Sequence, residues 1–330
     1  MNHGLPLVSP GEVGLSPERL ARLDAHFTRY VDEGRLAGWQ VVIARDGKVA
    51  HSSRCGFADR EESRPVSDDT IWRIFSMTKP ITAVAALMLW EEGRFELNDR
   101  VSKFIPEFGE SKVWRGGTFV NPILEPQTEP MLMWHLFTHT AGLTYGFMYS
   151  HPVDEIYRRA GMEWGFPRDL DLAGVCSLLA RQPLLFQPGR EWNYSTSIDV
   201  LGRVVEVISG QRLGEFLRQR IFEPLGMTDT AFWCPPDKVE RLSALYTKMP
   251  GKREAVRADG ADRGTRNEPA FDGGGGGLVS TMPDYVRFAE MLRRGGEFDG
   301  RRILSPRTVQ YMASNHLPGN ADLTQYGRPL

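Results

Sequence analysis

The feature that most constrains the fold is an apolar helical segment at residues 80–90, directly preceded by the run at residues 75–79. Nearly every position of residues 80–90 is apolar, which is typical of a helix buried inside a large domain. Pro80 falls in the first turn, where its missing N–H costs little, so the helix is predicted to begin at or just before Ser76. Ser76 and Lys79 then lie on one helical face, roughly 5–6 Å apart at Cβ.

This spacing indicates a serine nucleophile with a lysine activator three residues later. A lysine amine beside a serine hydroxyl can share the hydroxyl proton. The unpaired N–H groups and positive dipole end of the helix favour negative charge that develops near the hydroxyl. Serine followed by lysine at this spacing also arises by chance, but no other serine of this chain has a lysine three positions later.

Composition limits the classes of function. With 330 residues and 41% hydrophobic content, the chain can bury a sizeable core in one large domain or two smaller ones. Forty basic and 42 acidic side chains leave a net charge of -2, without a block of like charge, so we expect no binding to nucleic acid or to a membrane. The amino terminus lacks a basic region followed by an apolar stretch, which predicts a cytoplasmic protein. Cys55, Cys176 and Cys234 are far apart and are predicted to be free thiols.

The first part of the chain predicts a helix and a hairpin. Ser16 followed by proline is a typical helix start, and Gly34 is a typical helix end. Asp46-Gly47, a pair that favours a tight turn, lies between the segments 39–44 and 49–52, which predicts an antiparallel pair of strands.

The middle of the chain is predicted to be mostly helical, with almost no strand signal. Helical patterns occupy residues 80–92, 129–137, 172–181, 197–209 and 213–221, and another helix is expected near residues 283–294. Residues 234–277 are polar and rich in glycine, which predicts a long loop around a cleft.

A second chemical candidate is Tyr194. Pro188-Gly189 predicts a turn, which puts Tyr194 on a loop before a helix that begins near Ile198. A tyrosine in such a position is ordinarily a packing residue. Beside a serine–lysine pair, however, its phenol can accept the serine proton.

Other motifs point away from metal and cofactor chemistry. His135 and His139 lie four residues apart, but no glutamate base stands between them, so no metal site is predicted. The glycines at residues 273–277 lack the lysine of a phosphate-binding loop and the spacing of a dinucleotide fingerprint, and are interpreted as a backbone hinge beside the cleft. A glycine-any-serine-any-glycine elbow is absent from the sequence. We expect no cofactor.

Five segments, in order, resemble motifs of the serine β-lactamase-related family. They are Ser76-Met77-Thr78-Lys79 and residues 136–143, 188–195, 221–227 and 273–280. Within this family the chain is most similar to the bacterial esterases akin to class C β-lactamases, called family VIII carboxylesterases. The resemblance runs from about residue 10 to the last residue.

The resemblance implies an α+β, β-lactamase/transpeptidase-like fold, in which an antiparallel sheet flanked by helices accompanies an inserted, mainly helical region. We expect residues 1–75 and 285–330 to form the α/β region, and residues 76–284 to form the helical region with its cleft loops. The resemblance also implies that Ser76 is the acylated serine and that Lys79 and Tyr194 take its proton. Which of the two is the base stays open, because coupled groups titrate as a pair.

The implied activity is hydrolysis of short-chain or small aryl carboxylic esters through an acyl-serine. A small-molecule ester is therefore the expected partner, and the oligomeric state is left open. The residues expected to line the substrate pocket are Tyr145, Phe147, Trp192, Thr196, Gly275 and Gly276.

Two departures from the family pattern matter. Thr196 stands where the β-lactamases have asparagine, and a hydroxyl cannot supply both amide functions, which favours simple esters. After Gly277 no match to the family's third motif is found, so C-terminal strands are expected to be missing from this chain. We expect the natural protein to continue past Leu330, and these residues alone to be poorly stable or weakly active.

Two kinds of alternative stay open. One is a β-lactamase, a D-Ala-D-Ala peptidase-type hydrolase or an acyltransferase of the same fold. The other, from a different class, is a non-catalytic or assembly-forming relative that keeps the fold.

Overall fold

The structure of the protein is a computed structural model, which describes residues 4–258 and 265–327. The chain divides into two compact units. Unit 1 comprises Met1–Ile74, Phe222–Glu268 and Leu278–Arg301, and unit 2 comprises Phe75–Ile221, Pro269–Gly277 and Arg302–Leu330. The domain boundaries expected from the sequence, at residues 75/76 and 284/285, stay a prediction.

The helices and strands are as follows. The helices are α1 Pro17–Asp32, α2 Thr78–Glu91, α3 Met133–Phe137, α4 Pro152–Arg159, α5 Leu172–Ala180, α6 Ser197–Ser209, α7 Leu213–Leu217, α8 Glu223–Leu225, α9 Met282–Arg293, α10 Pro306–Met312 and α11 Leu323–Tyr326. The strands are β1 Gly38–Arg45, β2 Lys48–Asp59, β3 Arg64–Pro65, β4 Ile71–Arg73, β5 Lys112–Gly117, β6 Pro122–Pro126, β7 Tyr246–Lys248, β8 Ala255–Arg257, β9 Val279–Thr281, β10 Glu297–Phe298 and β11 Arg301–Arg302.

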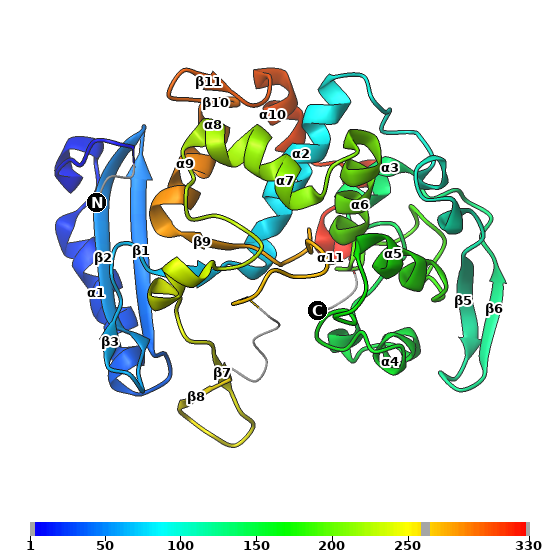
Figure 1. Cartoon of the computed structure of the whole chain (residues 1–330), viewed down its shortest axis with the longest axis horizontal. Helices are drawn as coiled ribbons and strands as arrows, with labels where there is room; N and C mark the ends of the chain where they lie inside the picture. Colours follow the sequence, from blue (N-terminus) through cyan, green and yellow to red (C-terminus); the bar gives the residue numbers. More distant parts are fainter. Residues whose placement is uncertain (1–3, 259–264, 328–330) are drawn as a thin grey trace. The chain divides into compact units, whose positions relative to one another are not determined.

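Unit 1 contains the predicted hairpin. Strands β1 and β2 pair antiparallel, and β3 adds a third strand beside β2. Asp46 and Gly47 take φ values of 52° and 76°, as a tight turn between twisted strands requires. Helix α1 lies along this sheet (Figure 1), and Asp24 on α1 bonds His51 and Ser53 on β2 at 2.8 and 2.7 Å. The predicted helix and hairpin are confirmed.

A second, two-stranded sheet of unit 1 pairs segments far apart in the sequence. Strands β4 and β9 run antiparallel, with Ile71 opposite Thr281. Ile71 packs in a buried cluster with Cys234, Leu242 and Val279. The Thr281 side chain then caps α9 by accepting a hydrogen bond from the Asp284 N–H, so the strand leads directly into the helix.

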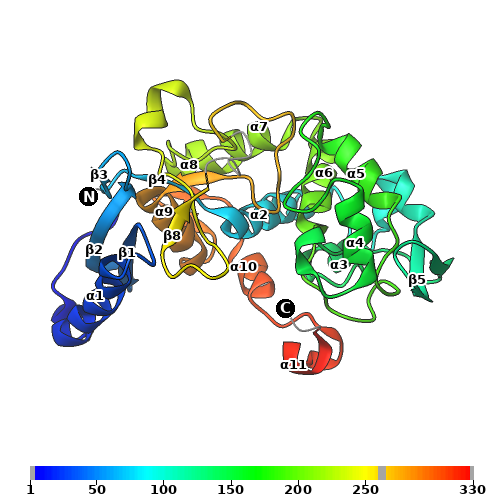
Figure 2. The same ribbon diagram turned by 90° about the horizontal axis from the view of Figure 1, so that it is seen from below.

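Unit 2 is built around α2, the apolar helix predicted from the sequence. Ile81, Val84 and Ala85 are fully buried. Helix α6 packs against α2, and α3, α5 and α7 pack against α6 (Figure 2). Because α2 is covered on most of its faces, the residues that begin it are held on a rigid support.

Several sequence-based predictions for the middle and end of the chain are wrong. Strands β5 and β6 form an antiparallel hairpin where few strand signals were found, because glycines and prolines stand at its ends. Helix α4, α10 and α11 were not predicted. The stretch at residues 234–277 is not one long loop, since it contains the short antiparallel pair β7–β8; its residues 259–264 lie outside the described part.

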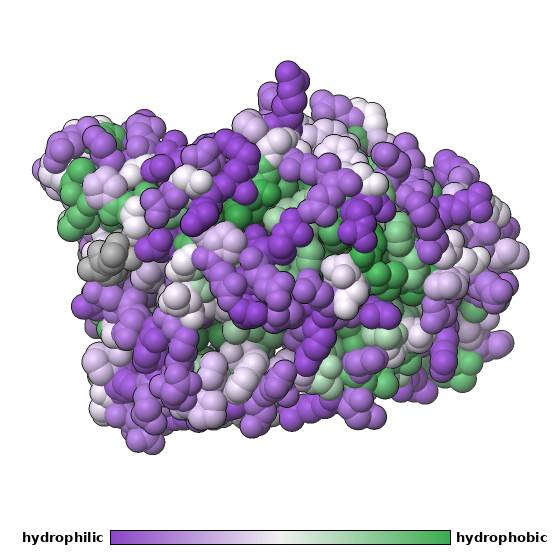
Figure 3. Space-filling model, turned by 45° about the horizontal axis from the view of Figure 1, so that its top comes forward, coloured by the Kyte–Doolittle hydropathy of each residue, from purple (hydrophilic) through white to green (hydrophobic). Residues whose placement is uncertain are grey.

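The surface and the cysteines complete the description. Hydrophilic side chains cover most of the face shown in Figure 3, with hydrophobic ones visible between them. The three cysteines are free, as predicted. Among the described residues, no helix combines the length and the apolar character that crossing a bilayer would need.

Candidate functional site

Ser76 lies on a single 3₁₀ turn, Phe75–Met77, which leads directly into α2 at Thr78. The expected helix start is therefore correct to within one turn. Phe75 enters the turn with a φ of 43°, a left-handed conformation that a bulky side chain rarely adopts. Ser76 is exposed, so its hydroxyl is presented at the surface of unit 2 rather than in its core.

The structure brings Lys79 and Tyr194 to the Ser76 hydroxyl. The Tyr194 hydroxyl donates a hydrogen bond to Ser76 Oγ at 2.5 Å, and Lys79 Nζ donates one to the same oxygen at 3.2 Å. The tyrosine comes from a segment 118 residues away in the sequence. Lys79 Nζ also lies 4.6 Å from the centre of the Tyr194 ring, over its face. A single oxygen thus accepts from two titratable donors.

The lysine is held from the other side by the glycine run. Lys79 Nζ donates to the Gly275 carbonyl at 2.6 Å, and one turn later Thr82 Oγ1 donates to the Gly274 carbonyl at 2.9 Å. The Gly275 N–H in turn donates to Asp199 Oδ1 at 2.9 Å. A Cβ at position 275 would lie 2.3 Å from Asp199 Oδ2, so only glycine fits there.

The loop that carries Tyr194 is fixed by its two neighbours. The Asn193 N–H donates to the His139 carbonyl at 3.0 Å, and the Asn193 amide donates to the Leu143 carbonyl at 3.2 Å. On the other side, Ser195 Oγ lies 3.1 Å from His139 Nδ1. These bonds anchor the backbone on both sides of Tyr194, which limits the freedom of the phenol.

Burial shifts the pKa values of three groups around the site. Burial raises the pKa of the Asp199 carboxyl, and the Lys79 charge acts in the opposite direction. Burial also raises the pKa of Tyr145 well above its ordinary value, with contributions from Asp199 and Tyr194, so this phenol stays neutral. The pKa of His139 falls to about 3, chiefly through burial and also through Lys79, so its ring is uncharged at neutral pH.

Some of the expected pocket residues lie beside this centre. Lys79 Nζ lies 5.5 Å from the centre of the Tyr145 ring, which also contacts the Tyr194 ring at 5.4 Å. Phe147 stacks on Tyr145 at 4.7 Å. A Cβ at Gly276 would meet the Phe75 backbone at 3.7 Å, an ordinary contact beside the serine turn.

Trp192 and Thr196 have other surroundings. The Trp192 ring contacts His139 edge to face at 6.1 Å, and its backbone pairs with Gly327. Thr196 is buried, and its hydroxyl has no hydrogen-bond partner among the described residues. Whether these residues meet a substrate stays a prediction.

Two residues of the centre were missed from the sequence. Asp199 carried a usable signal, because it is an acid among the apolar residues that begin α6, and the structure shows that it is buried. Thr82 carried none, since a threonine in an apolar helical pattern ordinarily serves packing. His135 and His139 were expected to brace the core or a loop; His135 is buried and His139 is half-buried, and His135 Nδ1 accepts the Leu132 N–H at 3.0 Å.

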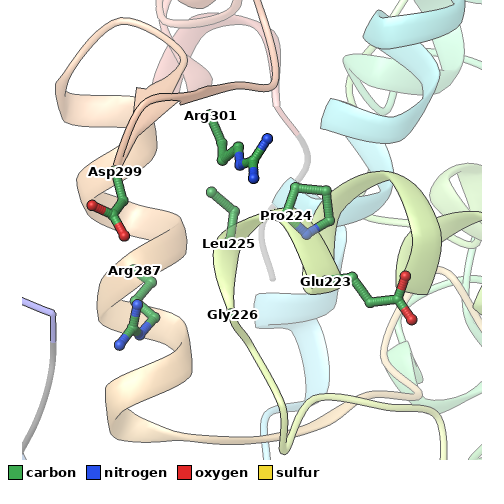
Figure 4. Close-up of a pocket in the computed structure, with 7 residues that line it drawn as sticks. All are labelled: Glu223, Pro224, Leu225, Gly226, Arg287, Asp299 and Arg301. Atoms are coloured by element: carbon green, nitrogen blue, oxygen red, sulfur yellow. The ribbon is translucent and has the colours of Figure 1, made fainter.

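Unit 1 has a pocket of about 310 Å³, shown in Figure 4. It is lined by Glu223, Pro224, Leu225, Gly226, Arg287, Asp299 and Arg301. None of these is a residue that the sequence predicts for the site. The pocket carries guanidinium and carboxylate groups together, with no group arranged as a nucleophile.

Comparison with known proteins decides the family. The family model described as Beta-lactamase matches residues 23–328. The chain belongs to the β-lactamase family.

Relatives of the chain include a protein named as an esterase. Esterase EstB of Burkholderia gladioli is 35% identical over 296 residues, which cover 84% of this chain and 71% of that protein. Protein Rv1367c of Mycobacterium tuberculosis H37Rv is 35% identical over 286 residues, 87% of this chain and 69% of that protein.

Solved structures of the β-lactamase family match the fold. EstCE1, described as a hydrolase with promiscuous acyltransferase activity, superposes with a TM-score of 0.75 and 30% identity, covering 91% of this chain and 79% of EstCE1. Simvastatin synthase LovD from Aspergillus terreus gives a TM-score of 0.78 and 25% identity, with coverages of 94% and 76%. The β-lactamase/transpeptidase-like fold and the resemblance to its esterases are thereby confirmed.

Proposed function

We propose that the protein is a carboxylesterase that cleaves short-chain or small aryl esters through an acyl-serine intermediate. The observation that carries the proposal is the pair of hydrogen bonds from Tyr194 and Lys79 to Ser76 Oγ, at 2.5 and 3.2 Å. Membership of the serine hydrolase and acyltransferase family, together with the likeness to EstB and EstCE1, supports it.

The chemistry follows from the charges of these groups. When both are protonated, neither the tyrosine nor the lysine can take up the Ser76 hydroxyl proton; loss of one proton turns that group into a base for it. Ser76 Oγ then bonds to the ester carbonyl carbon, the bond to the alcohol oxygen breaks, and the stored proton passes to the leaving alcohol. In the second half, the oxygen of a water molecule bonds to the acyl carbon and the bond to Ser76 Oγ breaks. A proton of that water returns to Ser76 Oγ, and the acid is released.

The surroundings of Lys79 support this role. The Gly275 carbonyl and the Tyr194 ring fix the ammonium group in place, so the pair is preorganised before substrate arrives. Thr196 supports a simple ester over a β-lactam, because its hydroxyl cannot replace the paired amide functions of asparagine. The partner is a small-molecule ester.

The test is covalent labelling. The wild type is incubated with a fluorophosphonate and with p-nitrophenyl acetate, and the intact mass is followed. We expect one adduct, mapped to the peptide that contains Ser76, and none with Ser76→Ala. Tyr194→Phe and Lys79→Met should each lower kcat by at least about 10²-fold, because each removes a proton acceptor or its partner. An adduct on another residue, or full turnover by Ser76→Ala, would refute the proposal.

Acyl transfer to an alcohol is the second candidate. It is favoured by the likeness to LovD, a simvastatin synthase, and to EstCE1, a hydrolase with promiscuous acyltransferase activity. The first half of the reaction is the same, and an alcohol replaces water in the second. Adding a primary alcohol to the p-nitrophenyl ester assay and measuring the ratio of new ester to free acid separates the two activities.

A further inference from the structure

Four aromatic rings of unit 2 form a continuous series that starts at the candidate nucleophile. We call Tyr194, Tyr145, Phe147 and Trp164 the aromatic row. Successive ring centres lie 5.4, 4.7 and 5.8 Å apart. The last two pairs are stacked, with interplanar angles of 18° and 11°. Such separations are typical of favourable aromatic pairs.

The row becomes more exposed with distance from the serine. Tyr194, Tyr145 and Phe147 are half-buried, whereas Trp164 is 58% exposed. At the near end, the two neighbours of the serine in sequence, Phe75 and Met77, are also exposed, by 53% and 48%. Apolar surface therefore accompanies the serine and continues along the row.

Backbone contacts hold the distal ring in position. Gly146 packs so closely on the segment before Trp164 that a Cβ there would lie 2.2 Å from the Met162 carbonyl oxygen. Arg158 donates to the Gly146 carbonyl at 2.5 Å, and the Tyr149 hydroxyl bonds the Glu163 carboxylate. Trp164 is therefore positioned by its own backbone and does not depend on a ligand for its stacking.

We propose that Trp164 is a specificity-determining residue, which binds the far end of an ester's apolar arm while the carbonyl lies at Ser76. The inference rests on the proposed function and goes beyond it: besides short-chain and small aryl esters, the site binds esters with an extended aromatic or alkyl group. Small esters reach Ser76 without touching Trp164, so they react independently of it.

The physical basis is the partly uncovered apolar surface of the row. Stacked rings present their edges side by side, and an aromatic or alkyl arm lying along them is removed from water. Each methylene so covered is worth up to about fourfold in binding. An aromatic arm gains a further about two- to tenfold from edge-to-face contact. Removing the Trp164 ring should therefore reduce the length of a substrate arm that the aromatic row can cover.

The experiment measures kcat/KM for a series of esters with the full chain. The short ester is p-nitrophenyl acetate. The extended esters are p-nitrophenyl decanoate, with an alkyl arm on the acyl half, p-nitrophenyl 2-naphthoate, with an aromatic arm there, and 2-naphthyl acetate, with the ring on the alcohol half. Trp164→Ala should lower kcat/KM for an extended ester about tenfold, mainly through KM, and change the acetate less than about twofold. Trp164→Phe should restore most of the loss.

Two variants provide controls. Tyr311→Ala removes another exposed aromatic, which stacks on Trp90 at 5.7 Å, and should leave all four rates unchanged. Gly146→Ala should displace Trp164 and reproduce the selectivity loss of Trp164→Ala.

The outcomes are separable. Loss for one or more extended esters alone supports the inference and identifies the half of the ester that carries the arm. Equal loss for all four esters, or no loss for any, overturns it while leaving the proposed function standing. Failure of the wild type to hydrolyse any of the four overturns the proposed function, and the inference with it.

Discussion

Gly275→Ala is the substitution whose effect follows most directly from the geometry. Its methyl group would lie 2.3 Å from Asp199 Oδ2, whereas ordinary contact begins at 3.4 Å, so the turn or the carboxylate must move by about 1 Å. Asp199 is buried in α6 and has little room to retreat. The shift therefore falls on the glycine turn and on the Gly275 carbonyl that holds Lys79.

The magnitude follows from that shift. A displacement of about 1 Å stretches the 2.6 Å bond from Lys79 Nζ to the carbonyl beyond hydrogen-bonding distance. Misplacement of a reacting group by that amount costs on the order of 10²-fold in rate. Overpacking a buried site also costs about 1–3 kcal/mol in the free energy of unfolding. We therefore expect kcat/KM to fall about 10²-fold, with a moderate loss of stability.

The assay compares p-nitrophenyl acetate turnover, the rate of fluorophosphonate labelling and urea unfolding. Gly116→Ala is the matched control, because a Cβ at position 116 meets nothing within 4 Å. Combining Gly275→Ala with Asp199→Ala removes the clash and should recover part of the lost stability. If Gly275→Ala folds and retains kcat/KM within about threefold of Gly116→Ala, the link from glycine turn to lysine is refuted.

Two further predictions concern stability. Burial lowers the pKa of His135 to about 4 and that of His139 to about 3, so the folded state binds fewer protons than the unfolded state below pH 6.5. The contribution of the two neutral histidines to stability is complete above pH 6.5 and is lost as the pH falls towards 4 and 3. Urea unfolding should show that the free energy of unfolding falls by about 2 kcal/mol per histidine by pH 5, and that it falls less steeply with pH in His135→Gln. An unchanged free energy of unfolding between pH 7 and pH 5 would contradict this. Thr196→Val removes a buried hydroxyl that has no hydrogen-bond partner among the described residues. It should raise the free energy of unfolding by up to about 1–3 kcal/mol and leave ester turnover unchanged. A drop in the free energy of unfolding or in turnover would mean that the hydroxyl binds water or substrate.

The strongest local sequence patterns correctly predicted elements of both units. The apolar run of α2 and the Asp46-Gly47 turn are local signals, and the elements that they predict are present. The approach of Tyr194 to Ser76 followed from a resemblance, because no local pattern reports a contact across 118 residues.

The failures have physical causes. Strand β6 begins and ends with proline and β5 ends in two glycines, so their composition indicates a turn, although cross-strand pairing stabilises them as a hairpin. Asp199 is buried and Trp164 stacks on Phe147, and both of these features depend on tertiary neighbours. Helix α4 is only eight residues long, and its start depends on a histidine cap, which is an uncommon capping residue.

Helix α2 links the candidate chemistry to the most protected part of unit 2. Ser76 directly precedes it, Lys79 lies in its first turn, and Thr82 anchors the glycine turn one turn further on. A helix buried to this extent exchanges its amide hydrogens only through large-scale opening. Thermal inactivation should therefore coincide with melting of the unit, without a folded but inactive state beforehand, and any molecule that refolds should regain its reactive serine at the same moment.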